Sequence, residues 1–234
     1  MKITHATDIG CIRTTNEDNY LCIEPNIYAV ADGMGGHAAG EVASRIMVDT
    51  IKANLAQKDT NECTEECLKS VILAANQEIL KASVDNPDYN GMGTTISLLY
   101  VHYGYATWAH VGDSRIYLLR DGQMHQITSD HSLVNELLQK NKITIKEAEN
   151  YPHKNILTRA VGVSVNLNVD TGYCDIKEAD KFIICSDGLT NMVSGETIQE
   201  ICYDDSIADK ADKLVKTAVD NGGRDNITCI VVEI

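Results

Sequence analysis

Short apolar runs, most of them bounded by glycine or polar residues, recur along the chain and indicate buried β-strands. An Asp-Gly pair at 121–122 separates two of these runs, and such a pair is typical of a tight hairpin turn. Most of the runs are too short for a buried helix. The runs that we interpret as strands are residues 27–31, 94–101, 105–111, 115–120, 123–128, 182–186 and 227–232.

Other segments place apolar residues three or four positions apart, which predicts helices with one buried face. Residues 40–55 follow this spacing, and Thr64 and the capping-box pattern at 144–147 mark the starts of further helices. The predicted helices are 40–55, 64–82, 132–140, one opening at 144, 194–202 and 206–219.

Strands therefore cluster and helices come in pairs, an order typical of an α+β fold rather than of strict β-α alternation. Two antiparallel β-sheets packed face to face, each covered by a pair of antiparallel helices, accommodate this order as a four-layer αββα sandwich. The polar segment 135–162 interrupts the pattern, and we interpret it as a flap.

Composition supports one large domain over residues 1–234. The chain has 44% hydrophobic residues, enough for a full core, and it shows no Pro/Ser-rich linker or repeat. Its 20 basic and 34 acidic residues give a formal net charge of −14. This charge argues against binding nucleic acid or an anionic membrane through a basic face.

The first residues lack the apolar stretch of a signal peptide, and no run approaches the length of a membrane span, so we expect a cytoplasmic protein. The eight cysteines include no Cys-x-x-Cys pair, and Cys63 and Cys67 have no nearby histidine to complete a zinc site. We interpret the cysteines as reduced thiols.

Three aspartates stand where predicted strands end or begin, each next to glycine or close to it. Asp32 and Asp187 follow apolar runs directly or within one residue, and Asp225 precedes the last run. A single Asp-Gly pair is usually a turn. Three carboxylates at the ends of strands in one sheet system can converge, and they repel each other unless cations neutralise them. The pattern therefore favours a site for a hard, oxygen-binding cation such as Mg²⁺ or Mn²⁺.

Two further segments carry candidate chemistry. Arg13 has the planar fork that binds two phosphate oxygens, and Glu17 and Asp18 can hold a metal ion or its waters. Taken alone, this segment also fits a solvated charged loop. Asp113 lies in a Gly-Asp-Ser-Arg sequence that by itself fits a turn between strands.

Six motifs occur together in one order, and in this order the chain resembles the metal-dependent (type 2C) serine/threonine protein phosphatases, in a compact bacterial form. The resemblance spans nearly the whole chain. The motifs are Arg13-x-x-x-Glu17-Asp18, Asp32-Gly33-Met34-Gly35-Gly36, Gly93-Thr94-Thr95, Gly112-Asp113-Ser114-Arg115, Ser186-Asp187-Gly188-Leu189 and Asp225-Asn226-Ile227-Thr228.

The resemblance implies a dinuclear Mn²⁺ or Mg²⁺ centre at one end of a β-sandwich. Asp32 would bridge the two ions, the carbonyl of Gly33 would bind one, and Asp187 and Asp225 the other. Asp113 would hold a third ion together with Asp187. A hydroxide between the metals would attack phosphorus in line, and no protein nucleophile would be needed.

The remaining roles follow from the same resemblance. Arg13 would hold the substrate phosphate, and Glu17 and Asp18 would act on the metal ions through waters. Asn226 would contact the metal-ligating residues rather than the metal ions. Some relatives carry a histidine, proposed as general acid, at the position of Met34, so the proton donor to the leaving group is left open.

The implied substrates are phosphorylated proteins, those of a Ser/Thr kinase, and we expect a monomer. Two alternatives remain at this point: a hydrolase of small phosphoesters, and a catalytically inactive phosphatase-like binding module. We interpret the histidines at 37, 110 and 131 as structural.

Overall fold

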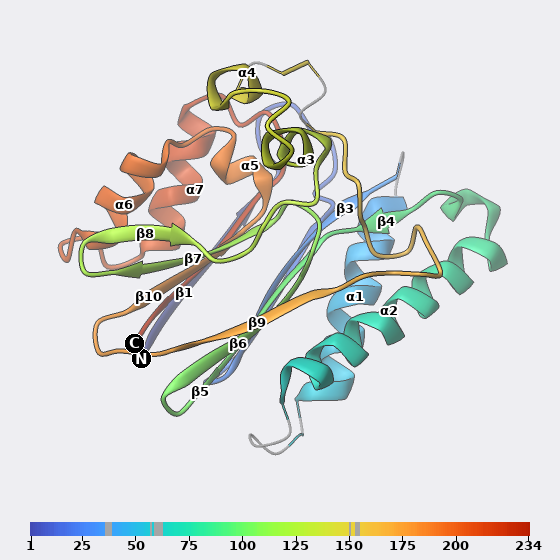
Figure 1. Cartoon of the computed structure of the whole chain (residues 1–234), viewed down its shortest axis with the longest axis horizontal. Helices are drawn as coiled ribbons and strands as arrows, with labels where there is room; N and C mark the ends of the chain where they lie inside the picture. Colours follow the sequence, from blue (N-terminus) through green and yellow to red (C-terminus); the bar gives the residue numbers. More distant parts are fainter. Residues whose placement is uncertain (36–38, 57, 59–62, 150, 153–154) are drawn as a thin grey trace.

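Two antiparallel β-sheets lie face to face in the computed structural model, which describes residues 1–35, 39–56, 58, 63–149, 151–152 and 155–234 (Figure 1). The first sheet has the order β1 (Lys2–Asp8), β11 (Ile227–Glu233), β10 (Lys181–Cys185), β7 (Arg115–Arg120) and β8 (Gln123–Gln126). The second has the order β2 (Asp18–Ile23), β3 (Ile27–Met34), β5 (Ile96–His102), β6 (Tyr105–Val111) and β9 (Asp170–Asp175), with β4 (Gly93–Thr94) paired to β3.

A pair of helices covers the outer face of each sheet. Helices α1 (Ala39–Leu55) and α2 (Glu65–Asp85) pack on the second sheet, and α6 (Gly195–Tyr203) and α7 (Lys210–Asp220) pack on the first (Figure 1). A third apolar cluster, with Tyr28, Leu99, Phe182 and Ile230 among its members, fills the space between the sheets. The predicted α+β fold with αββα layers is therefore confirmed.

Turn and helix-capping residues in the sequence predicted several element boundaries correctly. The hairpin of β7 and β8 closes through Asp121 and Gly122, both with positive φ, as the Asp-Gly signal predicts. Thr64 caps α2, and Thr144 and Glu147 form the expected reciprocal capping bonds before α4 (Ile145–Glu149). The last long helix begins at Lys210 rather than at residue 206, because the side chain of Asp209 caps it.

Three strands and two short helices, one of them a 3₁₀ helix, were not predicted from the sequence. Strands β1, β2 and β9 lie at sheet edges, where most of their residues are exposed or only partly buried and polar residues interrupt the apolar pattern. Helix α5 (Asp187–Thr190) is a single turn directly after β10. Two short elements complete the fold: the 3₁₀ helix η2 (Pro87–Tyr89) and helix α3 (Leu133–Gln139), capped by Ser132.

Strand register brings the predicted acidic residues to one end of the sandwich. Asp18 lies directly across from Asp32 in the β2–β3 ladder. Cys185 pairs with Cys229 at the end of β10. Asp187, two residues after β10, therefore lies near Asp225, two residues before β11. Helix α4 and most of α3 belong to the segment interpreted as a flap, and both helices lie over this same end (Figure 1). In the described part of the chain, no helix is both long enough and apolar enough to cross a bilayer.

Candidate active site

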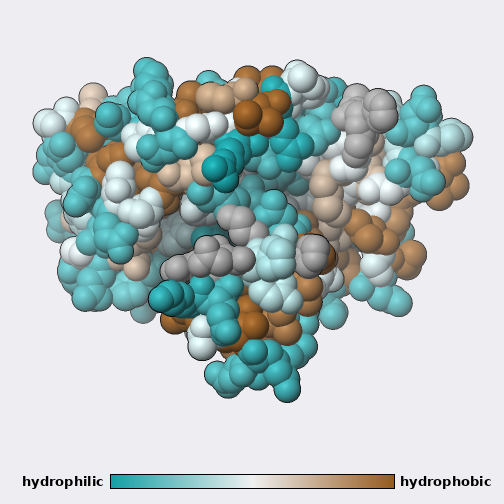
Figure 2. Space-filling view, turned by 90° about the horizontal axis from the view of Figure 1, so that it is seen from above, coloured by the Kyte–Doolittle hydropathy of each residue, from teal (hydrophilic) through white to brown (hydrophobic). Residues whose placement is uncertain are grey.

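A cavity of about 660 Å³ opens at this end of the sandwich and gathers most of the residues predicted as functional. Hydrophilic residues predominate around the hollow in this face of the molecule (Figure 2). Asp18 and Asn226 lie behind the cavity wall, where both are buried. The predicted residues that line the cavity are Arg13, Glu17, Asp32, Gly33, Met34, Asp113, Asp187 and Asp225.

The backbone around Asp32 is fixed by two threonines. The Asp32 amide donates to Thr95 Oγ1 over 2.9 Å, and its carbonyl accepts from the Thr95 amide over 2.8 Å and from Thr94 Oγ1 over 2.9 Å. These bonds divide the single strand predicted at 94–101 into β4 and β5, which are interrupted at Thr95. Asp32 therefore enters the cavity from a rigid strand end.

Gly33 allows α1 to approach β3 closely. A Cβ atom at this position would collide with the carbonyl group of Gly40 in the first turn of α1 and with the carbonyl oxygen of Glu17. The Gly33 amide donates to that same Glu17 oxygen over 3.1 Å. The close approach leaves the Gly33 backbone at the cavity wall.

Asp18 is a buried carboxylate held by the first sheet. Its Oδ2 accepts from Ser186 Oγ over 2.7 Å, and Ser186 Oγ accepts in turn from the Thr228 amide over 3.0 Å. Asp18 Oδ1 is buried and has no hydrogen-bond partner among the described residues. A buried acceptor without a donor is costly, so this oxygen suits a water or ion beside it.

Asn226 joins the N-terminal segment to the end of the sandwich. Its Oδ1 accepts from the Glu17 amide over 2.8 Å, and its Nδ2 donates to the carbonyl oxygens of Ile9 and Thr15, each over 3.0 Å. Arg13 lies between these anchored positions and donates from Nη2 to Asp225 Oδ2 over 2.7 Å. The charged segment around Arg13 and Glu17 is therefore anchored by hydrogen bonds to Asn226 and Asp225, and it is not a loose loop.

The carboxylates in and behind the cavity raise each other's pKa. Burial raises the pKa of Asp32 well above its usual range, and the charges of Asp18, Asp187 and Asp113 raise it further. Burial and the charge of Asp187 raise the pKa of Asp113 to about 7. Asp18 also has a pKa of about 7, raised by burial against the lowering effect of its hydroxyl donors.

This arrangement fits hydrated divalent cations. Buried like charges become compatible when cations lie between them, and carboxylate, carbonyl and water oxygens are the ligands that Mg²⁺ and Mn²⁺ prefer. Within the described ranges, no three acidic, histidine or cysteine side chains form a ready-made ligand cluster. Waters and the Gly33 carbonyl would therefore have to complete the coordination of each ion.

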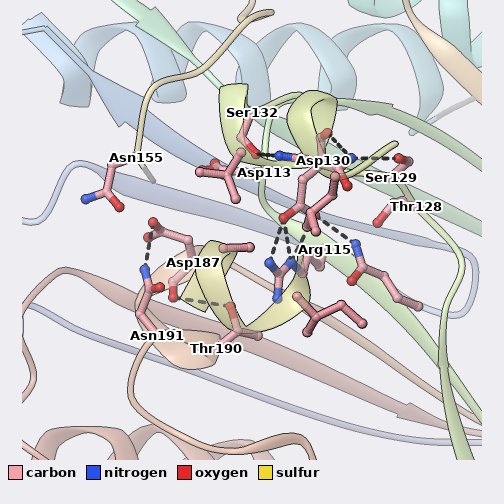
Figure 3. A pocket seen from close by; sticks show the side chains of 16 residues that line it. Asp113, Arg115, Thr128, Ser129, Asp130, Ser132, Asn155, Asp187, Thr190 and Asn191 are labelled. Carbon is pink, nitrogen blue, oxygen red and sulfur yellow. Dashed lines mark hydrogen bonds and ion pairs between the residues drawn. The ribbon is translucent and has the colours of Figure 1, made fainter. Parts of the chain in front are cut away.

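A second cavity of about 640 Å³ adjoins the first, and Asp113, Asn155 and Asp187 line both (Figure 3). Arg115 and Asp130 form a bidentate ion pair in its wall, with N–O distances of 2.6 and 2.9 Å. Residues of α3 and α4 also line this cavity, and several of them are apolar; they are Val134, Asn135, Leu138, Ile145 and Ala148. The segment interpreted as a flap therefore borders an extension of the acidic cavity.

Several residues of the site were not identified from the sequence. Thr95 and Ser186 belong to the motifs Gly93-Thr94-Thr95 and Ser186-Asp187-Gly188-Leu189, and this position in a motif could have identified them. Asn155 and Asn191 were not identified because no sequence motif marked them. Asn155 lines both cavities, and Asn191 Nδ2 donates to Asp187 Oδ2 over 2.9 Å. Gly36 and His37 lie outside the described residues. Two other histidines are buried, as expected of structural residues: His110 and His131.

Comparisons with known proteins agree with the geometry. Residues 13–229 match the family model for protein phosphatase 2C. Protein phosphatase PhpP of Streptococcus pneumoniae is 41% identical over 241 residues, covering 100% of this chain and 98% of that protein.

Solved structures of bacterial phosphatases show the same fold. The serine/threonine phosphatase PstP/Ppp of Mycobacterium tuberculosis superimposes with a TM-score of 0.94 at 34% identity, covering 100% of this chain and 98% of that one. The catalytic domain of serine/threonine protein phosphatase PstP in complex with two manganese ions gives a TM-score of 0.90 at 33% identity, covering 98% and 96%.

The match to the family model extends from Arg13 to Cys229, and it includes Asp32, Asp187 and Asp225. The chain therefore belongs to the protein phosphatase 2C family and is a serine/threonine protein phosphatase.

Proposed function

We propose that the chain removes phosphate from phosphoserine and phosphothreonine in proteins at the acidic cavity, using two Mn²⁺ or Mg²⁺ ions. Asp32, Asp187, Asp225 and the Gly33 carbonyl would hold these two ions. The observation that carries the proposal is the set of mutually repelling carboxylates that line one cavity together with Arg13. The relative solved with two manganese ions supports the metal requirement.

Bound ions would supply an activated water for in-line attack on phosphorus and positive charge to stabilise the phosphoryl oxygens. The residues of the chain orient the substrate. The Arg13 side chain is half-exposed, and one of its N–H groups bonds to Asp225, which leaves other donors for the phosphate. Glu17 and Asp18 would act on the ions through waters, the Asn226 side chain holds the Glu17 backbone, and Asp113 with Asp187 would hold a third ion.

The adjoining second cavity supports a protein substrate over a small phosphoester. It gives room next to Asp187 for residues that flank a phosphorylated side chain, and the side-chain amide and carbonyl groups of Asn155 line its wall. Such groups can bond to an extended peptide backbone. A small metabolite would leave this second cavity unused.

Phosphate release from phosphoserine and phosphothreonine peptides, compared with a panel of phosphorylated metabolites, tests the proposal. We expect turnover with Mn²⁺ on peptides, none in EDTA, and no phosphorylated enzyme during turnover. Preference for a metabolite would support the small-phosphoester alternative. Absence of metal binding by calorimetry, together with absence of turnover, would support the binding module.

We further propose that residues 1–234 act as one monomeric catalytic unit in signalling, on substrates of a Ser/Thr kinase. The eight cysteines are free thiols, which supports action in a reducing compartment such as the cytoplasm.

A further inference from the structure

His131 contacts the turn that carries Asp113 through both its side chain and its backbone. Its ring Nδ1 accepts from the Gly112 amide over 3.0 Å, and its own amide donates to the Gly112 carbonyl over 2.7 Å. Both polar backbone groups of Gly112 are therefore bonded to this one residue. His131 is 4% exposed, so water does not compete for these bonds.

The bond from Gly112 fixes the tautomer of the ring. An amide N–H can only donate, so Nδ1 carries no proton and Nε2–H donates to Asp170 Oδ2 over 3.0 Å. Asp170 Oδ1 accepts from Arg159 Nη1 over 2.6 Å. Burial lowers the pKa of His131, in agreement with a neutral ring.

The turn is also constrained on its other side. Gly112 has a φ of +110°, and a Cβ there would lie 2.6 Å from side-chain atoms of Thr95. Thr95 Oγ1 bonds to Ser114 Oγ over 2.6 Å and accepts from the Asp32 amide. Thr95 thus links the turn to Asp32, while His131 holds the turn from the side of the flap.

The chain just before the flap segment meets a later part of that segment at His131. Its carbonyl accepts from the Thr158 amide over 2.8 Å, and the neighbouring residues Ser132 and Leu157 form an isolated β-bridge. Arg159 reaches the ring of His131 through Asp170. The base of the flap and the turn that carries Asp113 are therefore joined at one buried side chain.

We propose that His131 is a positioning residue, which holds the Gly112–Asp113 turn so that Asp113 faces Asp187 in the acidic cavity. The consequence for turnover rests on the proposed phosphatase function, whereas the consequence for the turn does not. Loss of the Nδ1 acceptor should free the Gly112 amide and weaken the metal site that Asp113 completes.

A matched pair of substitutions separates the two ring bonds. In His131→Asn the side-chain oxygen stands near the place of Nδ1 and can accept from Gly112, whereas in His131→Gln the amide nitrogen stands near Nε2 and can donate to Asp170. We expect His131→Gln to speed deuterium exchange of the Gly112 amide by about tenfold, the effect of one lost hydrogen bond, and to raise the half-saturating Mn²⁺ concentration. His131→Asn should retain slow exchange and the wild-type Mn²⁺ requirement.

The control is His102→Asn, the same chemical change at the far end of β5, where Nδ1 has no hydrogen-bond partner among the described residues. It should change neither quantity. If His131→Gln does not fold, His131→Leu replaces it, because leucine also lacks the Nδ1 acceptor and its apolar side chain suits the buried position. Faster Gly112 exchange in that variant would support the proposal, and unchanged exchange would overturn it.

Equal Gly112 exchange and equal Mn²⁺ requirement in His131→Gln and His131→Asn would also overturn the proposal. A wild-type protein that protects the Gly112 amide but hydrolyses no phosphopeptide would contradict the proposed function alone. It would leave the positioning of the turn supported, since exchange is measured without substrate.

Discussion

Arg13 and Asp225 are joined by a 2.7 Å ion pair between segments 212 positions apart in the chain. The pair places the proposed phosphate-binding group beside a proposed metal ligand before any substrate arrives. Since Asp225 lines the same cavity as Asp32 and Asp187, a phosphate bound by Arg13 would lie next to the ions that those carboxylates hold.

Replacing Arg13 should impair turnover of phosphopeptides. We expect Arg13→Ala to lower kcat/KM by roughly tenfold to a hundredfold, since a charge-assisted hydrogen bond contributes about 1.5–3 kcal/mol. Arg13→Lys should recover only part of this loss, because an ammonium group lacks the planar fork. Steady-state kinetics on one phosphopeptide measure the effect, and an unchanged kcat/KM in Arg13→Ala would exclude phosphate binding by this residue.

Asp32→Asn should have opposite effects on activity and on stability. Loss of the Asp32 charge should reduce turnover on the order of a hundredfold or more, because the proposed ions that stabilise the reacting phosphoryl group would be held less well. In EDTA at pH 8 the same variant should melt at a higher temperature than the wild type, because the raised pKa of Asp32 shows that its charge is unfavourable in the metal-free fold. Calorimetric melting and p-nitrophenyl phosphate turnover test both parts. Full turnover in the variant would refute the role of Asp32.

The pKa of Asp113 predicts how the stability of the metal-free protein varies with pH. The folded-state value is about 7, above the ordinary value of 3.8, so between these pH values the folded state binds a proton that the unfolded chain does not. Asp113 therefore disfavours folding increasingly as pH rises from about 4 to 7, and its effect is constant above that range.

Urea unfolding of the wild type and Asp113→Asn in EDTA isolates this contribution. The buried histidines, such as His110 with a pKa lowered to about 4, act in the opposite direction but are the same in both proteins. We expect the stability of Asp113→Asn relative to the wild type to increase from pH 4 to pH 7. A constant difference would mean that Asp113 titrates normally.

Asp113→Ala tests the proposed third ion. A turn residue could be replaced at little cost to catalysis, whereas an ion held by few protein ligands should fill only at higher metal concentration. We expect the variant to fold, to keep the two-ion centre and to have lower kcat, most visibly on phosphopeptides whose leaving group needs a proton. Superimposable curves of kcat against Mn²⁺ for the two proteins, on phosphopeptide and p-nitrophenyl phosphate alike, would show that Asp113 is only a turn residue.

The sequence predicted best what short-range patterns determine. Strands β3 and β10 are buried on both faces and read as continuous apolar runs, and the helix caps at Thr64 and Thr144 lie within three residues of their partners. The edge strand β1 alternates exposed and partly buried residues, so its apolar signal was too weak to predict it.

Long-range contacts explain what the sequence could not show. Asp18 resembled part of a charged loop because its hydroxyl donor, Ser186, lies 168 positions away. The anchoring of Glu17 by Asn226 spans 209 positions. Such contacts follow from strand register, which no local pattern in these segments specified.

The most direct test of the metal centre is anomalous diffraction from crystals soaked in Mn²⁺. We predict two strong anomalous peaks in the cavity between Asp32, Asp187 and Asp225, with a weaker third peak between Asp113 and Asp187 at high Mn²⁺ concentration. Absence of anomalous signal in this cavity in fully soaked crystals, or manganese bound only elsewhere, would contradict the account.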